Sequence, residues 1–157
     1  MANKCFQALN RARLLFGAYP LIRSPTLDIG AKVANDKMQR RGVVKKDASI
    51  KHGQLQCIKM TSSNSVPTEC ISFWLLQMQN YDWSKPAMKD TSRFFVTAVY
   101  KAATHGGIAV KKGPSGRYFV TVLLDPAPDA SKLKKNVKGY SGKQWTNELK
   151  IFNKGSV

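Results

Sequence analysis

The feature that most constrains the fold is a β-hairpin predicted between residues 108 and 124. An apolar-rich run at 108–112 leads into the turn sequence Gly113-Pro114-Ser115-Gly116, and a second apolar run follows at 117–124. Proline and glycine supply the backbone angles that a tight reversal needs. The side chains of 118–124 are mostly apolar at both odd and even positions, which is typical of a strand buried on both faces. The sequence therefore predicts an antiparallel hairpin at the centre of the core.

The segments around this hairpin predict one more strand and several short helices. Gln54–Met60 has the composition of a strand. Residues 68–81 and 93–104 each fit either a helix or a strand, because their apolar runs are too short for periodicity to decide. Capping residues at Thr68 and at 90–92 favour helices, with the second expected to stop at His105-Gly106-Gly107. The expected fold is α+β, a small single core whose central hairpin is packed by short helices.

Composition divides this one folded unit into three parts. Residues 1–52 are predicted to form a basic N-terminal helix and arm, 53–130 the core, and 131–157 a basic C-terminal arm with a docking helix. With 157 residues and 43% hydrophobic content, the chain has enough apolar material for one core.

The two terminal parts have their own patterns. Cys5, Leu9, Ala12 and Phe16 share one face of a predicted helix that packs on the core and presents its arginines to a partner. Residues 23–53 fit an extended basic arm with a short helical piece near 29–39, or equally a solvated loop. At the other end, a helix is predicted from an apolar stripe spaced by four and three residues, Trp145, Leu149 and Phe152.

Positive charge is the main indication of function. The chain has 26 Lys and Arg against 9 Asp and Glu, a formal net charge of +17, and the excess is concentrated at the two ends. Such a surplus is typical of proteins that bind a polyanion, although each single cluster also fits a solvated surface. The prediction is a noncatalytic nucleic-acid-binding protein that contacts the phosphate backbone, with RNA preferred to DNA, in a ribonucleoprotein or other nucleoprotein assembly. An acidic protein partner or self-assembly is the alternative for the same charge.

Three groups of residues are predicted to contact nucleic acid. The first is a basic and aromatic hairpin tip: Lys111, Lys112, Arg117 and Tyr118. The second lies on the N-terminal arm: Arg40, Arg41, Lys45 and Lys46. The third lies on the C-terminal arm: Lys132, Lys134, Lys135 and Lys138.

The run SRFFVTAVYKAATHGGIAVKKGPSGRYFV at 92–120 resembles the last helix and wing of linker-histone globular domains. The resemblance implies duplex DNA bound by the helix in a groove, with Lys111, Lys112 and Arg117 as wing cations on the backbone. Upstream the likeness ends, because 83–89 leaves little room for the middle helix of such a domain. The chain is not assigned to that family.

Other functions have weaker support in the sequence. A small basic ribonuclease or toxin would need His52 and His105 as acid and base, together with carboxylates and cations such as Glu69, Glu148, Lys111 and Arg117. A viral-type coat or packaging protein would use the same basic arms. There is no phosphate-binding glycine loop, metal-ligand spacing or nucleophile elbow. We therefore expect no enzyme activity, cofactor or metal, and assign no catalytic residue.

The cysteines and apolar runs bear on location. Cys5, Cys57 and Cys70 form no close pair in sequence and are predicted to be buried and reduced, as in a cytosolic protein. No apolar run approaches the roughly 18 residues of a membrane-spanning helix. The expected location is cytoplasmic or in a nucleoprotein particle, with an organelle transit peptide at 1–27 as the alternative.

Overall fold

A four-stranded sheet forms the centre of the protein in the computed structural model, which describes residues 1–139. The strand order is β1 (Ile22–Arg23), β3 (His105–Lys112), β4 (Tyr118–Asp125) and β2 (Gly53–Lys59). β4 pairs antiparallel with both β3 and β2, whereas β1 pairs parallel with β3. The predicted α+β class is confirmed.

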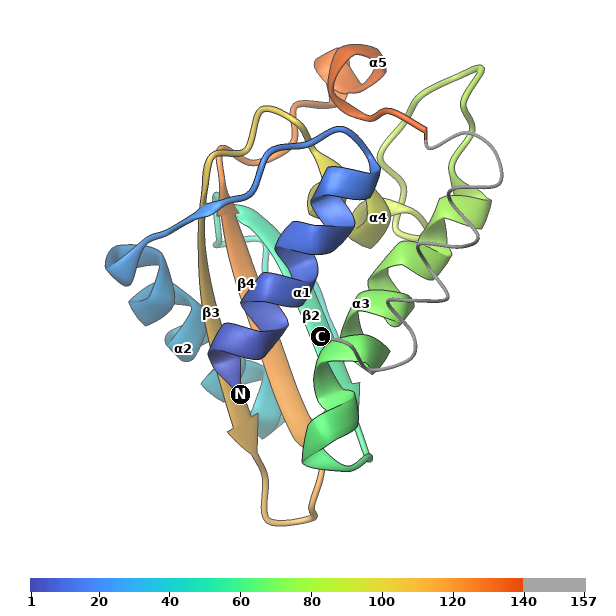
Figure 1. Ribbon diagram of the computed structural model, residues 1–157. Coiled ribbons are helices and arrows are strands. Elements are labelled where there is room, and N and C mark those ends of the chain that lie inside the picture. Colours follow the sequence, from blue (N-terminus) through green and yellow to red (C-terminus); the bar gives the residue numbers. More distant parts are fainter. Residues whose placement is uncertain (140–157) are drawn as a thin grey trace.

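Helices cover both faces of the sheet (Figure 1). α1 (Ala2–Leu15), α3 (Val66–Leu76) and α4 (Arg93–Val99) lie on one face, and α2 (Pro25–Arg41) lies on the other. A short helix, α5 (Leu133–Asn136), follows β4 at one end of the molecule. Among the described residues, no helix has the length and apolar character needed to cross a membrane. The architecture is three layers with the hairpin buried in the middle one, not a hairpin presented to nucleic acid.

The hairpin forms with the predicted turn. The Gly113 N–H donates to the Arg117 carbonyl at 2.8 Å, and Gly116 takes the left-handed conformation with φ +87°. On β4, Val120, Val122 and Leu124 belong to the larger core under α1, α3 and α4, while Leu123 packs with α2. Burial on both faces, predicted from composition, is therefore confirmed.

β3 begins at His105, three residues earlier than predicted. His105-Gly106-Gly107 was expected to stop a helix, and this prediction is wrong because all three residues pair with β4. Gly107 has a different role: a Cβ there would lie 2.1 Å from the Leu27 carbonyl carbon. Glycine at this position allows α2 to pack directly on the sheet.

The predicted basic arm at 23–53 is mostly helix. α2 has 17 residues, begins with Pro25 at its first position, and is capped by the Ser24 hydroxyl, which accepts from the Leu27 N–H at 3.2 Å. Gly42 ends it in the left-handed conformation with φ +76°. A narrow stripe of small and apolar side chains is buried on the sheet: Leu27, Ala31, Ala34 and Met38. The short helical piece predicted near 29–39 is therefore confirmed and is longer than expected. The extended arm is wrong for 25–41, because the charged residues between the members of the stripe hide its helical periodicity.

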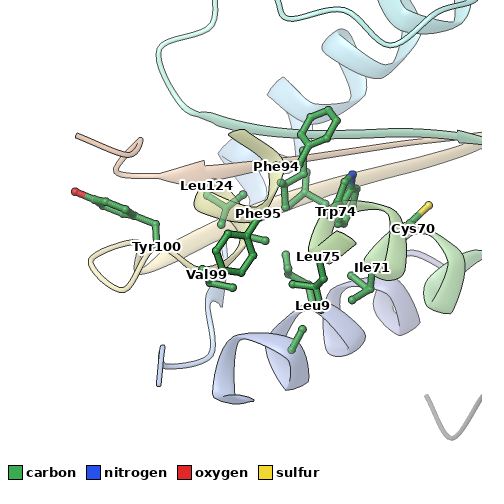
Figure 2. Packing of buried hydrophobic residues seen from close by; sticks show 14 of the residues in the cluster. Leu9, Cys70, Ile71, Trp74, Leu75, Phe94, Phe95, Val99, Tyr100 and Leu124 are labelled. Carbon is green, nitrogen blue, oxygen red and sulfur yellow. The ribbon is translucent and has the colours of Figure 1, made fainter. Parts of the chain in front are cut away.

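Residues 66–76 and 93–99 are helices, so the strand alternative for both segments is wrong. α3 begins at Val66, before the cap predicted at Thr68, with Pro67 in its first turn. Figure 2 shows how its Trp74 packs in the core with Phe94 and Phe95 of α4. The Trp74 indole donates to the Gln56 carbonyl at 2.9 Å, which connects α3 to β2.

α4 stops at Val99, earlier than predicted. Its end is stabilised by Arg13, which donates hydrogen bonds to carbonyl groups that a longer helix would have bonded internally. The Arg13 guanidinium donates to the carbonyls of Ala98 at 3.0 Å, Tyr100 at 3.1 Å and Ala103 at 3.0 Å. Its Nε donates to the Tyr19 carbonyl at 2.9 Å. The side chain is fully buried, and burial lowers its pKa to about 10. The prediction that α1 presents its arginines to a partner is therefore wrong for Arg13.

The cysteine prediction is confirmed in its structural part. Cys5, Cys57 and Cys70 are all buried and free. Burial raises the pKa of Cys5 to about 12, so this thiol stays protonated. The helix predicted from Trp145 to Phe152 lies outside the described residues.

Candidate anion-binding site

The cations of the predicted hairpin tip contact the protein itself. Lys111 Nζ lies 3.8 Å from a carboxylate oxygen of Asp36 on α2. Lys112 lies over the ring of Tyr118, with its Nζ 5.7 Å from the ring centre. Arg117 donates to the Gly42 carbonyl at 3.4 Å, just beyond α2. These contacts join the hairpin tip to the end of α2, where Arg40 and Arg41 lie.

The three predicted groups do not form one surface. The hairpin turn and α5 lie at opposite ends of the molecule (Figure 1), which separates the tip from Lys132, Lys134 and Lys135 at α5. Lys132 is in addition 3.9 Å from Asp129.

The linker-histone resemblance also fails on geometry. A helix followed by a hairpin is present, but α4 is not available to a DNA groove, because Phe94, Phe95, Val96, Thr97, Ala98 and Val99 are all buried. Its residues form the core, and the resemblance was limited to the order of the elements.

The two histidines lie on either side of one carboxylate, at the ends of neighbouring strands. His52 Nδ1 is 3.3 Å from Asp125 Oδ1, and His105 pairs with Asp125 across the β3–β4 ladder. His105 Nδ1 is 2.8 Å from the Thr104 hydroxyl. His105 is therefore a strand residue and not the helix-terminus residue that the sequence indicated.

The loop at 43–52 is fixed from within by Asp47. The Asp47 N–H donates to the Gln54 side-chain oxygen at 3.2 Å, and the Gln54 amide returns a bond to the Asp47 carbonyl at 2.8 Å. The Asp47 carboxylate accepts from the Ser49 hydroxyl at 2.6 Å and the Ser49 N–H at 3.0 Å. Hydrogen bonds from Ser49, assisted by Lys37, hold the pKa of Asp47 below its ordinary value. Because Asp47 is directed inward, Lys46 and Lys51 remain on the outer side of the loop.

A cavity of about 180 Å³ lies between this loop and α4. Its lining includes four side chains that carry or can carry positive charge, and none that carries negative charge: Lys46, Lys51, His52 and Arg93. The wall behind them is tight, since a Cβ on Gly53 would lie 2.9 Å from the Thr97 methyl group. Within residues 1–139, Lys46, Lys51 and Arg93 form no ion pair within 4 Å.

Arg93 is the most constrained of these cations. Its guanidinium carbon is 4.2 Å from the centre of the Phe94 ring, in a cation–π contact. Burial lowers the pKa of Arg93, and the charge of nearby Asp90 partly opposes this shift. The side chain stays charged at neutral pH and is partly withdrawn from water. A half-buried, immobilised guanidinium is well suited to bind an oxyanion.

Sequence reasoning found little of this cavity. Among its cations only Lys46 was in a predicted group, and His52 was considered for a different role. Lys51 and Arg93 were missed. Arg93 stands alone before two phenylalanines in the sequence, so no local cluster of charge indicated it.

Comparison with known proteins gives the family. The model of the CAP family, described as the cysteine-rich secretory protein family, matches residues 6–124. Hookworm platelet inhibitor is 14% identical with a TM-score of 0.65, over 81% of this chain and 69% of that chain. Venom allergen-like protein 4 of Schistosoma mansoni is 13% identical with a TM-score of 0.65, over 92% and 97%. No curated protein sequence matches the chain.

A third structure, that of NaASP2 with Zn²⁺, is 13% identical with a TM-score of 0.55, over 86% of this chain and 82% of that chain. The zinc ion of NaASP2 raises the question of a metal site in this chain. Among the residues that the structure describes, no three His, Cys, Asp or Glu side chains are close enough to hold a metal ion. His52, His105 and Asp125 come near one another without forming such a group. The residues at 1–139 therefore do not fit a zinc site, and no metal chemistry is assigned to them.

These matches correct the functional predictions made from charge. A nucleic-acid-binding function, an RNA or DNA partner and a nucleoprotein assembly are wrong, because the matching model and structures belong to CAP and venom allergen-like proteins. The cytoplasmic or nucleoprotein location is wrong for the same reason, since the family is one of secretory proteins. Charge alone indicated an anionic partner, but not the kind of protein that carries the charge. With 6–124 matched by the family model and the same fold in the solved structures, the chain belongs to the CAP family.

Proposed function

We propose that this CAP domain acts by binding, and that the cavity beside α4 accepts a tetrahedral oxyanion, a phosphate or sulfate group of a larger ligand. The observation that supports this most is the lining of the cavity: Lys46, Lys51 and Arg93 line it and no carboxylate of residues 1–139 does. Asp125 lies beside His52 at 3.3 Å, and Asp90 lies near Arg93. Some cations elsewhere on the molecule do pair with acids, as Arg23 does with Asp28 at 2.7 Å, so the distinction of the three cavity cations is that they line one concave site together. Unpaired cations around a concave site favour an anionic ligand.

The size of the cavity supports a small charged group and not an extended polymer. A volume of about 180 Å³ corresponds to several water molecules at roughly 30 Å³ each, enough for one tetrahedral group and its solvent. Arg93 supplies the planar fork that matches two oxygens of such a group, and the lysines supply point charges. The hookworm protein is named for inhibiting platelets, and a binding function agrees with that name.

The test is a titration with sodium phosphate and sodium sulfate at constant ionic strength, followed by ¹⁵N-HSQC spectra. We expect shifts confined to residues around 46–54 and 93, with millimolar affinity for the bare anions. Arg93→Gln should weaken binding at least tenfold, while Lys101→Gln, which removes the same charge from an exposed lysine outside the cavity, should leave it unchanged. Equal losses in both variants would show attraction by net charge alone and overturn the proposal.

Two further binding experiments distinguish the source of the oxyanion. Glycerol phosphate and a sulfated disaccharide represent soluble ligands. Vesicles of phosphatidylglycerol, compared with vesicles of phosphatidylcholine, represent lipid headgroups. In each experiment, the ligand that belongs to this site loses affinity in Arg93→Gln and keeps it in Lys101→Gln.

A further inference from the structure

The edge of β3 is open over its second half. β1 occupies the first half, where the Ser24 N–H donates to the Gly106 carbonyl at 2.9 Å. The next backbone group that points to this edge is the Ile108 N–H, which donates to the Asp28 carboxylate at 2.9 Å. Backbone groups of alternate residues point to the same edge of a strand, so those of Val110 and Lys112 point outward as well. Within the described residues these groups have no hydrogen-bond partner.

A groove of about 430 Å³ lies along this open edge, between β3 and α2. β3 contributes Ile108, Ala109, Val110 and Lys111, and α2 contributes Ile29 and Lys32 among others. The Ile29 side chain is unusually free for a large apolar residue, with 69% of the residue exposed. The groove therefore combines unpaired backbone donors and acceptors with exposed apolar surface.

The charges around the groove favour an acidic occupant. Its two carboxylates are already bound, Asp28 by Arg23 at 2.7 Å and Asp36 by Lys32 at 3.3 Å and Lys111 at 3.8 Å. Lys32 and Lys111 remain largely exposed despite these contacts, with 74% and 55% of their side chains accessible. Lys112 follows at the end of the same edge. The groove is thus left with a positive excess and no free carboxylate.

We propose that this groove is a docking site for an extended acidic peptide segment of a partner protein, which adds to the sheet beside β3 in line with β1. The backbone of the segment pairs with Val110 and Lys112, and its acidic side chains face Lys32 and Lys111. β1 shows that this edge already accepts a strand in the same protein. A second copy of the chain is disfavoured, because two edges rich in lysine on molecules of net charge +17 repel each other. The site is separate from the cavity beside α4.

The test uses a blocked five-residue peptide of alternating glutamate and valine, titrated into the ¹⁵N-labelled protein. We expect chemical-shift changes along 108–112 and at least tenfold slower hydrogen exchange of the Val110 and Lys112 amides. The same peptide with alternate backbone nitrogens methylated, and a peptide of alternating lysine and valine, should not bind. Binding of the methylated peptide equal to that of the parent would overturn strand addition.

Two variants complete the test. Val110→Pro removes an outward N–H without breaking a bond to β4, so the fold should persist and peptide binding should fall at least tenfold. Arg93→Gln, in the other site, should bind the peptide as the wild type does. Unchanged peptide binding by a folded Val110→Pro variant, or shifts that map to α5 or to the α4 cavity, would overturn the proposal. Either result leaves the phosphate titration, and with it the proposed function, to be judged separately.

Discussion

Arg13 and Arg93 are two partly or fully buried arginines that carry out opposite tasks. Arg13 is fully buried and all of its described bonds go to backbone carbonyls of the loop after α1, of the last turn of α4 and of the segment after α4. Arg93 lies on the first turn of α4, lines a cavity, and makes no ion pair in the described part of the chain. The first guanidinium donates four hydrogen bonds within the fold, whereas the second retains donors for a ligand.

The contrast between the two arginines shows why positive charge is ambiguous in a sequence. A surplus of cations includes residues that serve as internal hydrogen-bond donors, such as Arg13, and residues that pair with acids, such as Lys37 with Asp47 at 3.4 Å. A cation can bind an external anion only through donors that such internal contacts leave unused. The location of their partners decides between these roles, and the partners are distant in sequence.

Replacing Arg13 should have the largest effect, a loss in the free energy of unfolding. Arg13→Met removes all four carbonyl contacts, and each buried acceptor left without a partner costs roughly 1–3 kcal/mol. We expect a loss of at least about 3 kcal/mol in the free energy of unfolding, measured by urea denaturation. Lys4→Met, an exposed position on the same helix, should change stability by less than about 0.5 kcal/mol. A stability loss for Arg13→Met no larger than that of Lys4→Met would contradict the structural role.

A second internal polar contact tests whether the same rule holds on the other face of the sheet. The buried Asn35 amide donates to the Phe119 carbonyl at 3.0 Å, and its oxygen accepts from the Thr121 hydroxyl at 2.8 Å. Asn35→Ala should reduce the free energy of unfolding by about 2 kcal/mol, because α2 loses both bonds to β4. Asn3→Ala, which removes an exposed bond to Arg23, is the matched control. Similar small effects in both variants would show that α2 is held by apolar packing alone.

A substitution in the α4 cavity should have the opposite pattern, a small change in stability and a large loss of anion binding. Arg93→Gln is expected to change the free energy of unfolding by less than about 1 kcal/mol, since the half-buried guanidinium forms no ion pair within 4 Å in the described residues, and to weaken phosphate binding at least tenfold. Thermal unfolding and the phosphate titration on the same sample give both values. A variant that unfolds like Arg13→Met would place Arg93 with the structural arginines.

The smallest expected effect is a change in the free energy of unfolding at acidic pH. Because the folded state lowers the pKa of Asp47, this carboxylate contributes stability that is present above its ordinary pKa and lost as pH falls through the folded value. Asp47→Asn should therefore be less stable than the wild type at pH 7, and the difference should shrink below about pH 4. Ser49→Ala, which removes one hydroxyl bond, should show part of the same effect. Urea titrations at several pH values measure it, and a difference that persists unchanged at low pH would contradict this role.

The parts of the fold that local signals determine were predictable. The turn Gly113-Pro114-Ser115-Gly116 predicted the hairpin, and the apolar residues at both odd and even positions of β4 predicted its burial on both faces. α2 was predicted only as a short helical piece near 29–39, although Ser24-Pro25 and Gly42 mark its ends, because its buried face is a narrow stripe of small and apolar side chains among charged residues. The end of α4 was beyond sequence reasoning, since the carbonyls of Ala98 and Tyr100 are satisfied by an arginine 85 or more positions away.

The candidate site was harder to predict from the sequence than the fold was. Lys46 was found because it stands in a run of charge, and Arg93 was missed because its neighbours in sequence are core residues. The cavity is assembled from the loop at 43–52, which Asp47 joins to Gln54 of β2, and from α4, and these parts are distant in sequence. The family, too, was not visible from charge, because net charge varies independently of fold.

The most direct test of the binding function is a crystal structure after soaking with sodium selenate, an anomalous scatterer with the shape of sulfate. We expect an anomalous peak in the α4 cavity, within hydrogen-bond distance of the Arg93 guanidinium and close to Lys46 or Lys51, and no such peak in Arg93→Gln crystals. Selenate bound elsewhere on the lysine-rich surface, with the cavity containing only water, would contradict the proposed function.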